Sequence, residues 1–428
     1  MPDNNFTYIE GSCHCELNCF SVAFQTAQLP ISTDLCHCNT CRHASGQLAV
    51  EQVNIEGVPM KSANPGSRRG ARSANGGSRS RSASPNPSGR TNKHTLNGAK
   101  SGGLLAVPTV LGPVVVPDDE PLKPLELNDL VAYKSSPKRT RYFCRGCSSH
   151  LFSVGHTDGQ DTWCVGVGAL DDIDGIVQVG YHMWLGDTLD GGIADQLPSI
   201  NGVELPRYKD GQGSDQVPIG WKADETKVKA PERLLAYCHC RAVQFALCRP
   251  SEQSSEPTRA YPDLLYPYDV TRLSKVNNSK DEKWWLRASN SKYLAGHCMC
   301  TFCRLASGFD VQSWGFVPLA DMVDVESGKS LNLEADASRP KGLKRYISSP
   351  GRYREFCGTC GASVFWWDAG VPDLVDVSMG LFDEKGAGGA RAEDWFEWCT
   401  TRVSFEEKAN NKDLAKGLGE GLKATIKK

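Results

Sequence analysis

Short stretches in which apolar and polar residues alternate predict a protein built mainly from β-strands. The alternation is clear in SVAFQT (21–26) and AVQFAL (242–247), and LVAYKS (130–135), RYFC (141–144) and HLFSV (150–154) read as further short strands. Each of these stretches lies close to cysteines. We therefore expect the cysteines to occupy strand ends and hairpin turns of a mainly β fold.

The cysteine-rich stretches occur twice in the same order, which indicates an internal duplication. CHCNTCRHASG (36–46) returns as CMCTFCRLASG (298–308), and LVAYKSSPKRTRYFCRGCSSHLF (130–152) returns as LKRYISSPGRYREFCGTCGASVF (343–365). Two further pairs of stretches are GSCHCELNCFSVAF (11–24) with AYCHCRAVQFAL (236–247) and VGVGALDD (165–172) with VSMGLFDE (377–384). We expect tandem domains at 5–206 and 231–412, a polar linker at 207–230 and a charged helical tail at 413–428.

Seven cysteines recur in each copy and are candidate metal ligands. They are Cys13, Cys15, Cys36, Cys38, Cys41, Cys144 and Cys147 in the first copy and Cys238, Cys240, Cys298, Cys300, Cys303, Cys357 and Cys360 in the second. Two short pairs drawn from distant parts of the chain can form a four-cysteine zinc site. The remaining triplet is one ligand short, which is typical of a catalytic zinc with an open position. A different partition, in which the first pair joins the triplet, stays possible.

The other cysteines and the neighbouring histidines are weaker candidates. Four cysteines do not recur and are read as small buried apolar residues: Cys19, Cys164, Cys248 and Cys399. His37 lies inside the first triplet and could bind zinc, but Met299 takes its place in the second. His14 and His239 lie between paired cysteines, and we expect their side chains to point away from the metal.

The distribution of charge separates one segment from the rest. Between Met60 and Gly103 there are nine Lys or Arg and no Asp or Glu, whereas the remaining chain carries 39 basic and 50 acidic residues. The segment is rich in Ser, Gly, Arg and Pro, so we expect residues 60–103 to be a disordered insertion. It could contact nucleic acid, or it could be a tolerated loop. A second insertion, between Cys240 and Cys298, contains aromatic residues and is expected to pack.

The compartment follows from the cysteine content and from the absence of export signals. The chain has 18 cysteines, and neither a secretory signal nor an apolar run long enough for a membrane helix is recognisable. In a reducing compartment, clustered cysteines are more often metal ligands than disulfides. We expect an intracellular protein, cytoplasmic or nuclear, that does not associate with membranes.

The ordered motifs resemble the glutathione-dependent formaldehyde-activating enzyme family, which includes centromere protein V-like proteins. The resemblance rests on GSCHC, CHCNTCRHASG and RYFCRGC in the first copy and on YCHCRAVQF, CMCTFCRLASG and REFCGTCG in the second. It implies a β-tent-like sandwich with two zinc ions per domain, four per chain. By this resemblance the paired cysteines hold the structural zinc ions and the triplets hold the catalytic ones.

The resemblance also implies an activity, namely a carbon–sulfur lyase that forms or cleaves S-(hydroxymethyl)glutathione. Arg42 and Arg304 directly follow the triplets and could bind a glutathione carboxylate, or they could form bracing ion pairs. Two departures from the family pattern concern the turns at the paired cysteines. After the first cysteine pair, the family has glycine, but this chain has Glu16 in the first copy and Arg241 in the second. After the second pair, the second copy keeps the family glycine as Gly361, whereas the first copy has Ser148. A left-handed backbone at these turns favours glycine.

Two other functions compete with this interpretation. The protein could be a non-catalytic zinc scaffold that meets nucleic acid or chromatin through the basic insertion, or a lyase for a different thiol adduct. The intact triplets favour catalysis, and the acidic balance outside the insertion disfavours broad phosphate binding.

Overall fold

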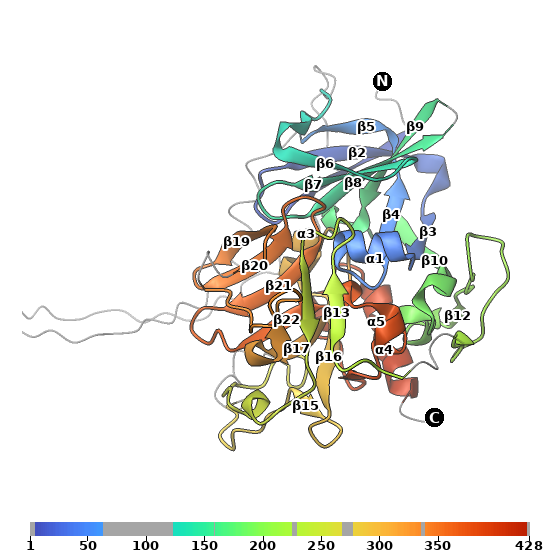
Figure 1. Ribbon diagram of the computed structural model, residues 1–428. Helices are drawn as coiled ribbons and strands as arrows, with labels where there is room; N and C mark the ends of the chain where they lie inside the picture. The colour runs from blue at the N-terminus through green and yellow to red at the C-terminus, as the bar shows by residue number, and fades with distance from the viewer. Residues whose placement is uncertain are drawn as a thin grey trace, which may run out of the picture. The chain divides into compact units, whose positions relative to one another are not determined.

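The computed structural model describes residues 5–62, 123–157, 159–224, 229–267, 277–334 and 339–425, and these form a mainly β protein, as the sequence predicted (Figure 1). We call residues 5–224 the first half and residues 229–425 the second half. Most of the predicted insertion, 63–103, lies outside the described residues. Met60 and Lys61, which the sequence placed at the start of that insertion, instead pair with a neighbouring strand.

The first half contains a three-stranded sheet in the order β1-β2-β5 and a seven-stranded sheet in the order β10-β3-β4-β9-β8-β7-β6. The strands are β1 (Phe6–Ser12), β2 (Cys19–Gln25), β3 (Ile31–Cys36), β4 (Val50–Asn54), β5 (Glu56–Lys61), β6 (Leu130–Ser136), β7 (Arg139–Cys144), β8 (His150–Thr157), β9 (Gln160–Gly166) and β10 (Val177–Met183). A short hairpin of β11 (Ser199–Ile200) and β12 (Val203–Glu204) follows. Strand β10 pairs with β3 in parallel, and the other pairs of the large sheet are antiparallel.

The second half has the corresponding arrangement. Its small sheet has the order β13-β14-β18, and its large sheet has the order β15-β16-β17-β22-β21-β20-β19, with β23 parallel to β16. The strands are β13 (Leu234–Tyr237), β14 (Gln244–Leu247), β15 (Leu286–Arg287), β16 (Lys292–Cys298), β17 (Gln312–Pro318), β18 (Met322–Val323), β19 (Leu343–Ser349), β20 (Arg352–Cys357), β21 (Ser363–Asp368), β22 (Leu374–Ser378) and β23 (Phe396–Trp398).

Few helices interrupt the strands. The α-helices are α1 (Asn39–Ser45), α3 (Thr301–Ser307), α4 (Glu384–Ala387) and α5 (Lys412–Thr425). Single 3₁₀ turns are η1 (Thr26–Gln28), η2 (Leu127–Asp129), η3 (Val167–Ala169), η4 (Leu185–Thr188), η5 (Gly192–Asp195), η7 (Gln253–Ser255), η8 (Leu319–Asp321), η10 (Met379–Leu381) and η11 (Glu406–Lys408). The helices α1 and α3 occupy the same place in the two halves, since each follows the strand that ends in the first cysteine of a triplet.

The apolar core does not divide at the predicted linker. One large cluster of buried side chains joins Leu35, Leu48 and Leu197 of the first half to Phe245 and Trp395 of the second. Residues of both halves accordingly belong to one compact unit. The proposed domain boundaries at 206 and 231 stay predictions, but the two halves share buried apolar surface, which is the main favourable term in folding.

The predicted charged tail is a packed helix. Helix α5 contacts β11 of the first half and buries the apolar side chains of Leu414, Leu418 and Leu422. Gly421 faces the backbone oxygen of Gln196 so closely that an added Cβ would lie 2.1 Å from it. The tail therefore ties the C-terminal end of the described chain to the first half. None of the described helices combines the length and the apolar character needed to cross a membrane.

Candidate metal centres

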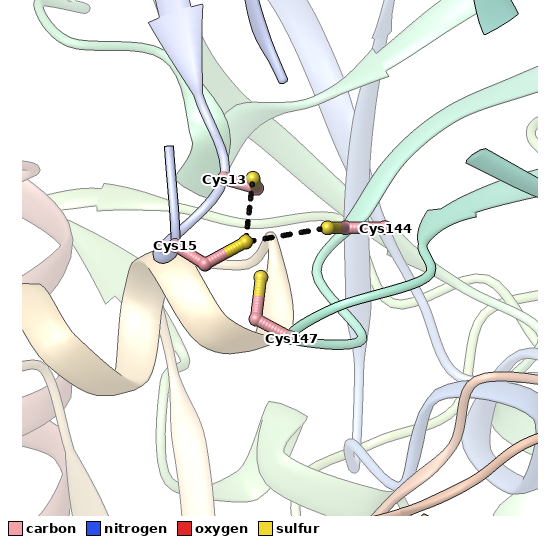
Figure 2. Close-up of side chains that lie close together, drawn as sticks. All are labelled: Cys13, Cys15, Cys144 and Cys147. Atoms are coloured by element: carbon pink, nitrogen blue, oxygen red, sulfur yellow. Dashed lines mark hydrogen bonds between the residues drawn. The ribbon is translucent and has the colours of Figure 1, made fainter. Parts of the chain in front are cut away.

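The structure brings Cys13, Cys15, Cys144 and Cys147 together in the first half (Figure 2). The first two follow β1, and the other two lie at the turn between β7 and β8. All four Sγ atoms lie within 4.8 Å of one another, with 3.6 Å between Cys13 and Cys15 and 3.5 Å between Cys15 and Cys144. A tetrahedral zinc with Zn–S bonds of about 2.3 Å places its sulfurs about 3.8 Å apart. The group is therefore the right size for one zinc ion.

The second half assembles the equivalent group from Cys238, Cys240, Cys357 and Cys360. The Sγ atoms of Cys238 and Cys240 are 3.5 Å apart, and those of Cys240 and Cys357 are 3.4 Å apart. Each pair again comes from the turn after one strand, here β13 and β20. Two hairpin turns that are distant in the sequence thus supply two ligands each, which is the arrangement of a structural zinc site.

The backbone at these turns has the conformation that the family glycines suggested. The φ angles at the four corresponding positions are positive, at 60° for Glu16, 61° for Arg241, 65° for Ser148 and 81° for Gly361. Non-glycine residues adopt this left-handed conformation at a cost of order 1 kcal/mol. The turn points backbone N–H groups at sulfur: those of Asn18, Gly146, Val243 and Thr359 each lie 3.4 Å from the Sγ of a ligand cysteine. Such hydrogen bonds favour the thiolate form that binds metal.

The two triplets form separate three-cysteine groups. In the first half, Cys36 ends β3, Cys38 is the N-cap of α1, and Cys41 lies in its first turn, with 3.4 Å between the Sγ atoms of Cys36 and Cys41. Cys298, Cys300 and Cys303 have the same positions relative to β16 and α3. Among the described residues, no fourth His, Cys, Asp or Glu completes either group. Each set of three sulfurs could hold a metal ion.

The caps of these two short helices explain how the triplets take their shape. The thiol groups of Cys38 and Cys300 accept hydrogen bonds from the backbone N–H of Cys41 and Cys303, at 3.3 and 3.2 Å. Glycine ends both helices in the left-handed conformation, with φ of 79° at Gly46 and 86° at Gly308. The Cys-x-x-Cys spacing is thus an N-cap and a first-turn residue whose sulfurs converge.

A buried arginine contacts each triplet, and the sequence analysis missed both. The Nη2 group of Arg141 lies 3.1 Å from the Sγ of Cys41, and that of Arg354 lies 3.4 Å from the Sγ of Cys303. Hydrogen bonds from Cys36 and Cys38, together with the positive charge of Arg141, lower the pKa of the Cys41 thiol, and Arg354 acts in the same way on Cys303. Arg141 stands three residues before Cys144, and Arg354 stands three residues before Cys357. That repeated position was the signal available in the sequence.

One half-buried carboxyl group also interacts electrostatically with each triplet. Burial, followed by the charge of Cys41, raises the pKa of Asp34 to about 7, and burial followed by the charge of Cys303 raises that of Asp376 to about 8. The two come from different strands, β3 and β22, and do not correspond in the repeat. Cys164, for which no metal role was expected, holds the first-half position equivalent to Asp376 and lies outside the four groups.

The histidines and the remaining cysteines lie outside the four groups. The ring of His37 is buried and its Nε2 is 3.0 Å from Nδ1 of His182, whose other nitrogen bonds the backbone oxygen of Leu197. His14 and His239 bond the hydroxyl groups of Tyr346 and Tyr133, at 2.6 and 2.5 Å. The cysteines that do not recur are free thiols: Cys164 and Cys399 are buried, and Cys19 and Cys248 are half-buried.

Arg42 and Arg304 have partners inside the protein. The Nη2 of Arg42 lies 3.0 Å from a carboxylate oxygen of Glu384, and the Nη1 of Arg304 lies 2.5 and 2.7 Å from the backbone oxygens of Gly168 and Leu170. Both side chains are buried. Their bracing role is therefore visible in the structure, whereas contact with a glutathione carboxylate stays a prediction.

Comparison with known proteins gives one match. Residues 285–398 match the family model of the glutathione-dependent formaldehyde-activating enzyme. This match supports the family that the sequence motifs resemble. The family region includes the second triplet and Cys357 and Cys360, and it begins after Cys238 and Cys240. Searches of curated proteins and of solved structures found no match.

Proposed function

We propose that the protein is a zinc-dependent carbon–sulfur lyase that forms or cleaves S-(hydroxymethyl)glutathione, with an open three-cysteine site in each half. The observation that carries this proposal is the second triplet. It lies inside the family region, its three sulfurs converge, and no fourth ligand completes the group among the described residues. The first triplet has the same local structure, so the proposal extends to it.

The reaction joins two small molecules and needs one proton to move. The glutathione sulfur bonds the carbonyl carbon of formaldehyde, the thiol loses its proton, and the carbonyl oxygen becomes the hydroxyl of the adduct. A bound zinc ion would supply Lewis acidity and would favour a deprotonated thiol or hydroxyl group at its vacant position. Cys36, Cys38 and Cys41 would hold this ion in the first half, and Cys298, Cys300 and Cys303 in the second.

The surrounding side chains would position the thiolates, carry a proton and bind a glutathione carboxylate. Arg141 and Arg354 hold one sulfur of each triplet by a charge-assisted hydrogen bond and offset the negative charge of three thiolates. Burial raises the pKa values of Asp34 and Asp376, which makes these two carboxyl groups candidates to hold or release a proton. Arg42 keeps two buried nitrogens without a partner among the described residues, Nε and Nη1, and these are candidate donors to a glutathione carboxylate.

The proposed metal content is four zinc ions per chain. The two four-cysteine groups would be closed structural sites that fix pairs of hairpin turns, and the triplets would be the reactive sites. Structural zinc contributes directly to folding free energy, whereas an open site can lose its metal with the fold retained. The two classes of site should therefore respond differently to chelators.

Turnover of S-(hydroxymethyl)glutathione by the full chain tests the activity. We expect saturable turnover that falls at least about 100-fold when Cys38→Ser and Cys300→Ser are combined, and each single variant reports the share of its own half. Cys399→Ser is the matched control, because Cys399 is buried but belongs to none of the four groups. Turnover that survives the double variant would refute the lyase assignment.

The alternative is a zinc scaffold that binds nucleic acid, and the composition of residues 60–103 is the observation that favours it. A salt-dependent shift of duplex DNA that disappears when 63–103 is deleted, together with no turnover, would support this alternative. We also propose that the protein lies in the cytoplasm or nucleus, which imaging of the tagged chain tests.

A further inference from the structure

Helices α1 and α3, which each contain the last cysteine of a triplet, pack against the opposite half of the protein. Helix α1 packs against η10 of the second half, and α3 packs against η3 of the first. The glycines that end these helices fit directly against the opposite backbone. A Cβ added to Gly46 would lie 2.2 Å from the oxygen of Ser363, and one added to Gly308 would lie 2.1 Å from the oxygen of His150. The C-terminal end of each helix is therefore in close backbone contact with the opposite half.

The turns that receive the helices are equally close. The backbone N–H of Gly380 in η10 donates to the oxygen of Gly46, at 3.1 Å. A Cβ on Gly380 would lie 2.2 Å from the oxygen of Gln47, and one on Gly168 would lie 2.4 Å from the backbone of Phe309. Gly168 and Gly380 correspond in the repeat, so the same close backbone approach is made twice, once in each direction.

The side chains that clamp the two helices are different. On α1, Arg42 and Asn39 both bond the carboxylate of Glu384, at 3.0 and 3.2 Å. On α3, Arg304 donates to two backbone oxygens of the first half, those of Gly168 and Leu170. Burial raises the pKa of Glu384, but the nearby His43 ring and the charge of Arg42 outweigh this effect and lower the pKa to about 2. Glu384 is therefore a charged, buried partner of the first triplet's helix.

A residue of the second half also borders the first triplet directly. Phe309 belongs to the same small apolar cluster as Cys36, Cys41 and Val50, and its side chain is buried. The environment of the first three-cysteine group is thus built from both halves. A single half carries the three sulfurs of its triplet but not the surface that orients their helix.

We propose that each three-cysteine site is composite, with ligands from one half and their positioning contacts from the other, and that Glu384 of the second half is a positioning residue for the first half's metal site. This rests on the proposed metal binding by the triplets. It goes beyond that proposal because it assigns the duplication a function: each half completes the other's site.

Metal affinity measured site by site in the full chain tests this inference. In a Cys298→Ser, Cys300→Ser, Cys303→Ser background, only the first triplet remains, and in a Cys36→Ser, Cys38→Ser, Cys41→Ser background only the second remains. The four-cysteine groups are filled with zinc, and Co²⁺ is then titrated into the remaining triplet, where thiolate-to-cobalt absorption reports binding. Glu384→Gln is introduced into both backgrounds. The control is Asp172→Asn, because Asp172 is the equivalent residue of the first half and is exposed.

We expect Glu384→Gln to weaken Co²⁺ binding at the first triplet by about 10- to 100-fold, the usual effect of removing a partner that orients a ligand. Binding at the second triplet should change less than about twofold in the same variant, and Asp172→Asn should leave both sites unchanged. Equal weakening of both triplets would reveal general destabilisation and overturn the inference, as would unchanged binding at the first. If the parent backgrounds bind no Co²⁺ at either triplet, the proposed function itself fails.

Discussion

Replacing Arg141 by alanine should weaken metal binding at the first triplet and leave the fold in place. The substitution removes the hydrogen bond from the Arg141 Nη2 to the Cys41 thiolate, which is 3.1 Å long and buried. A hydrogen bond to a charged group contributes about 1.5–3 kcal/mol. At about 1.4 kcal/mol for each factor of ten, this corresponds to about 10- to 100-fold in affinity.

The second half gives an internal scale for this prediction. The equivalent contact of Arg354 with Cys303 is longer, at 3.4 Å, so we expect Arg354→Ala to have the smaller effect on its own triplet. Arg141→Lys should lie between alanine and the unaltered protein, because lysine keeps the charge but lacks the planar fork. Arg139→Ala is the control, since Arg139 lies on the same strand and bonds Ser153 and Cys164 rather than a metal-group cysteine.

Competition between the protein and a chromophoric chelator, in backgrounds that keep one triplet at a time, measures these affinities. Thermal unfolding of the same samples shows whether each variant is folded. The reasoning would be wrong if Arg141→Ala and Arg139→Ala changed the affinity of the first triplet equally, or if neither changed it by more than about twofold.

Three further predictions concern the ligands and a buried acid. Cys38→Ser and Cys300→Ser should each release one zinc ion without global unfolding, and elemental analysis together with circular dichroism checks this; unfolding would count against an open-site role. Cys144→Ser should remove a structural zinc and markedly lower the unfolding temperature, in contrast to the triplet variants. Burial and the carboxyl groups of Asp310 and Asp34 raise the pKa of Glu51, whose oxygens have no hydrogen-bond partner among the described residues. The contribution of Glu51 to stability is therefore greatest below its unfolded pKa of about 4.3 and is lost as the pH rises. Between about pH 5 and about pH 8, urea unfolding should show a smaller loss of stability for Glu51→Gln than for the unaltered protein. The same pH dependence in both proteins would contradict this prediction.

The grouping of the cysteines was accessible from the sequence because the duplication acts as an internal comparison. Cysteines that recur at fixed spacing are separated from Cys19, Cys164, Cys248 and Cys399, which do not. The mainly β fold was also accessible, since alternating apolar residues mark strands that bury one face. The positive φ angles at the paired-cysteine turns follow from the expected role of glycine there.

The contacts between the halves could not be predicted from the sequence, because no local sequence pattern specifies them. Arg42 and Glu384 are 342 positions apart, and they meet because α1 packs against the second half. The same holds for α5: a charged helical tail was expected, but the burial of Leu414, Leu418 and Leu422 was not. The contact of Arg141 with Cys41 forms because the folded sheet brings β7 next to the triplet. The spacing of cysteines along the sequence does not predict the order of strands in a sheet.

Zinc stoichiometry of the purified full chain under reducing conditions tests the central claim most directly. The account predicts four zinc ions per chain, of which two are lost first to a chelator and are absent when both triplets are replaced by serine. Two zinc ions per chain, unchanged by that replacement, would mean that the triplets bind no zinc and would contradict the proposed open sites.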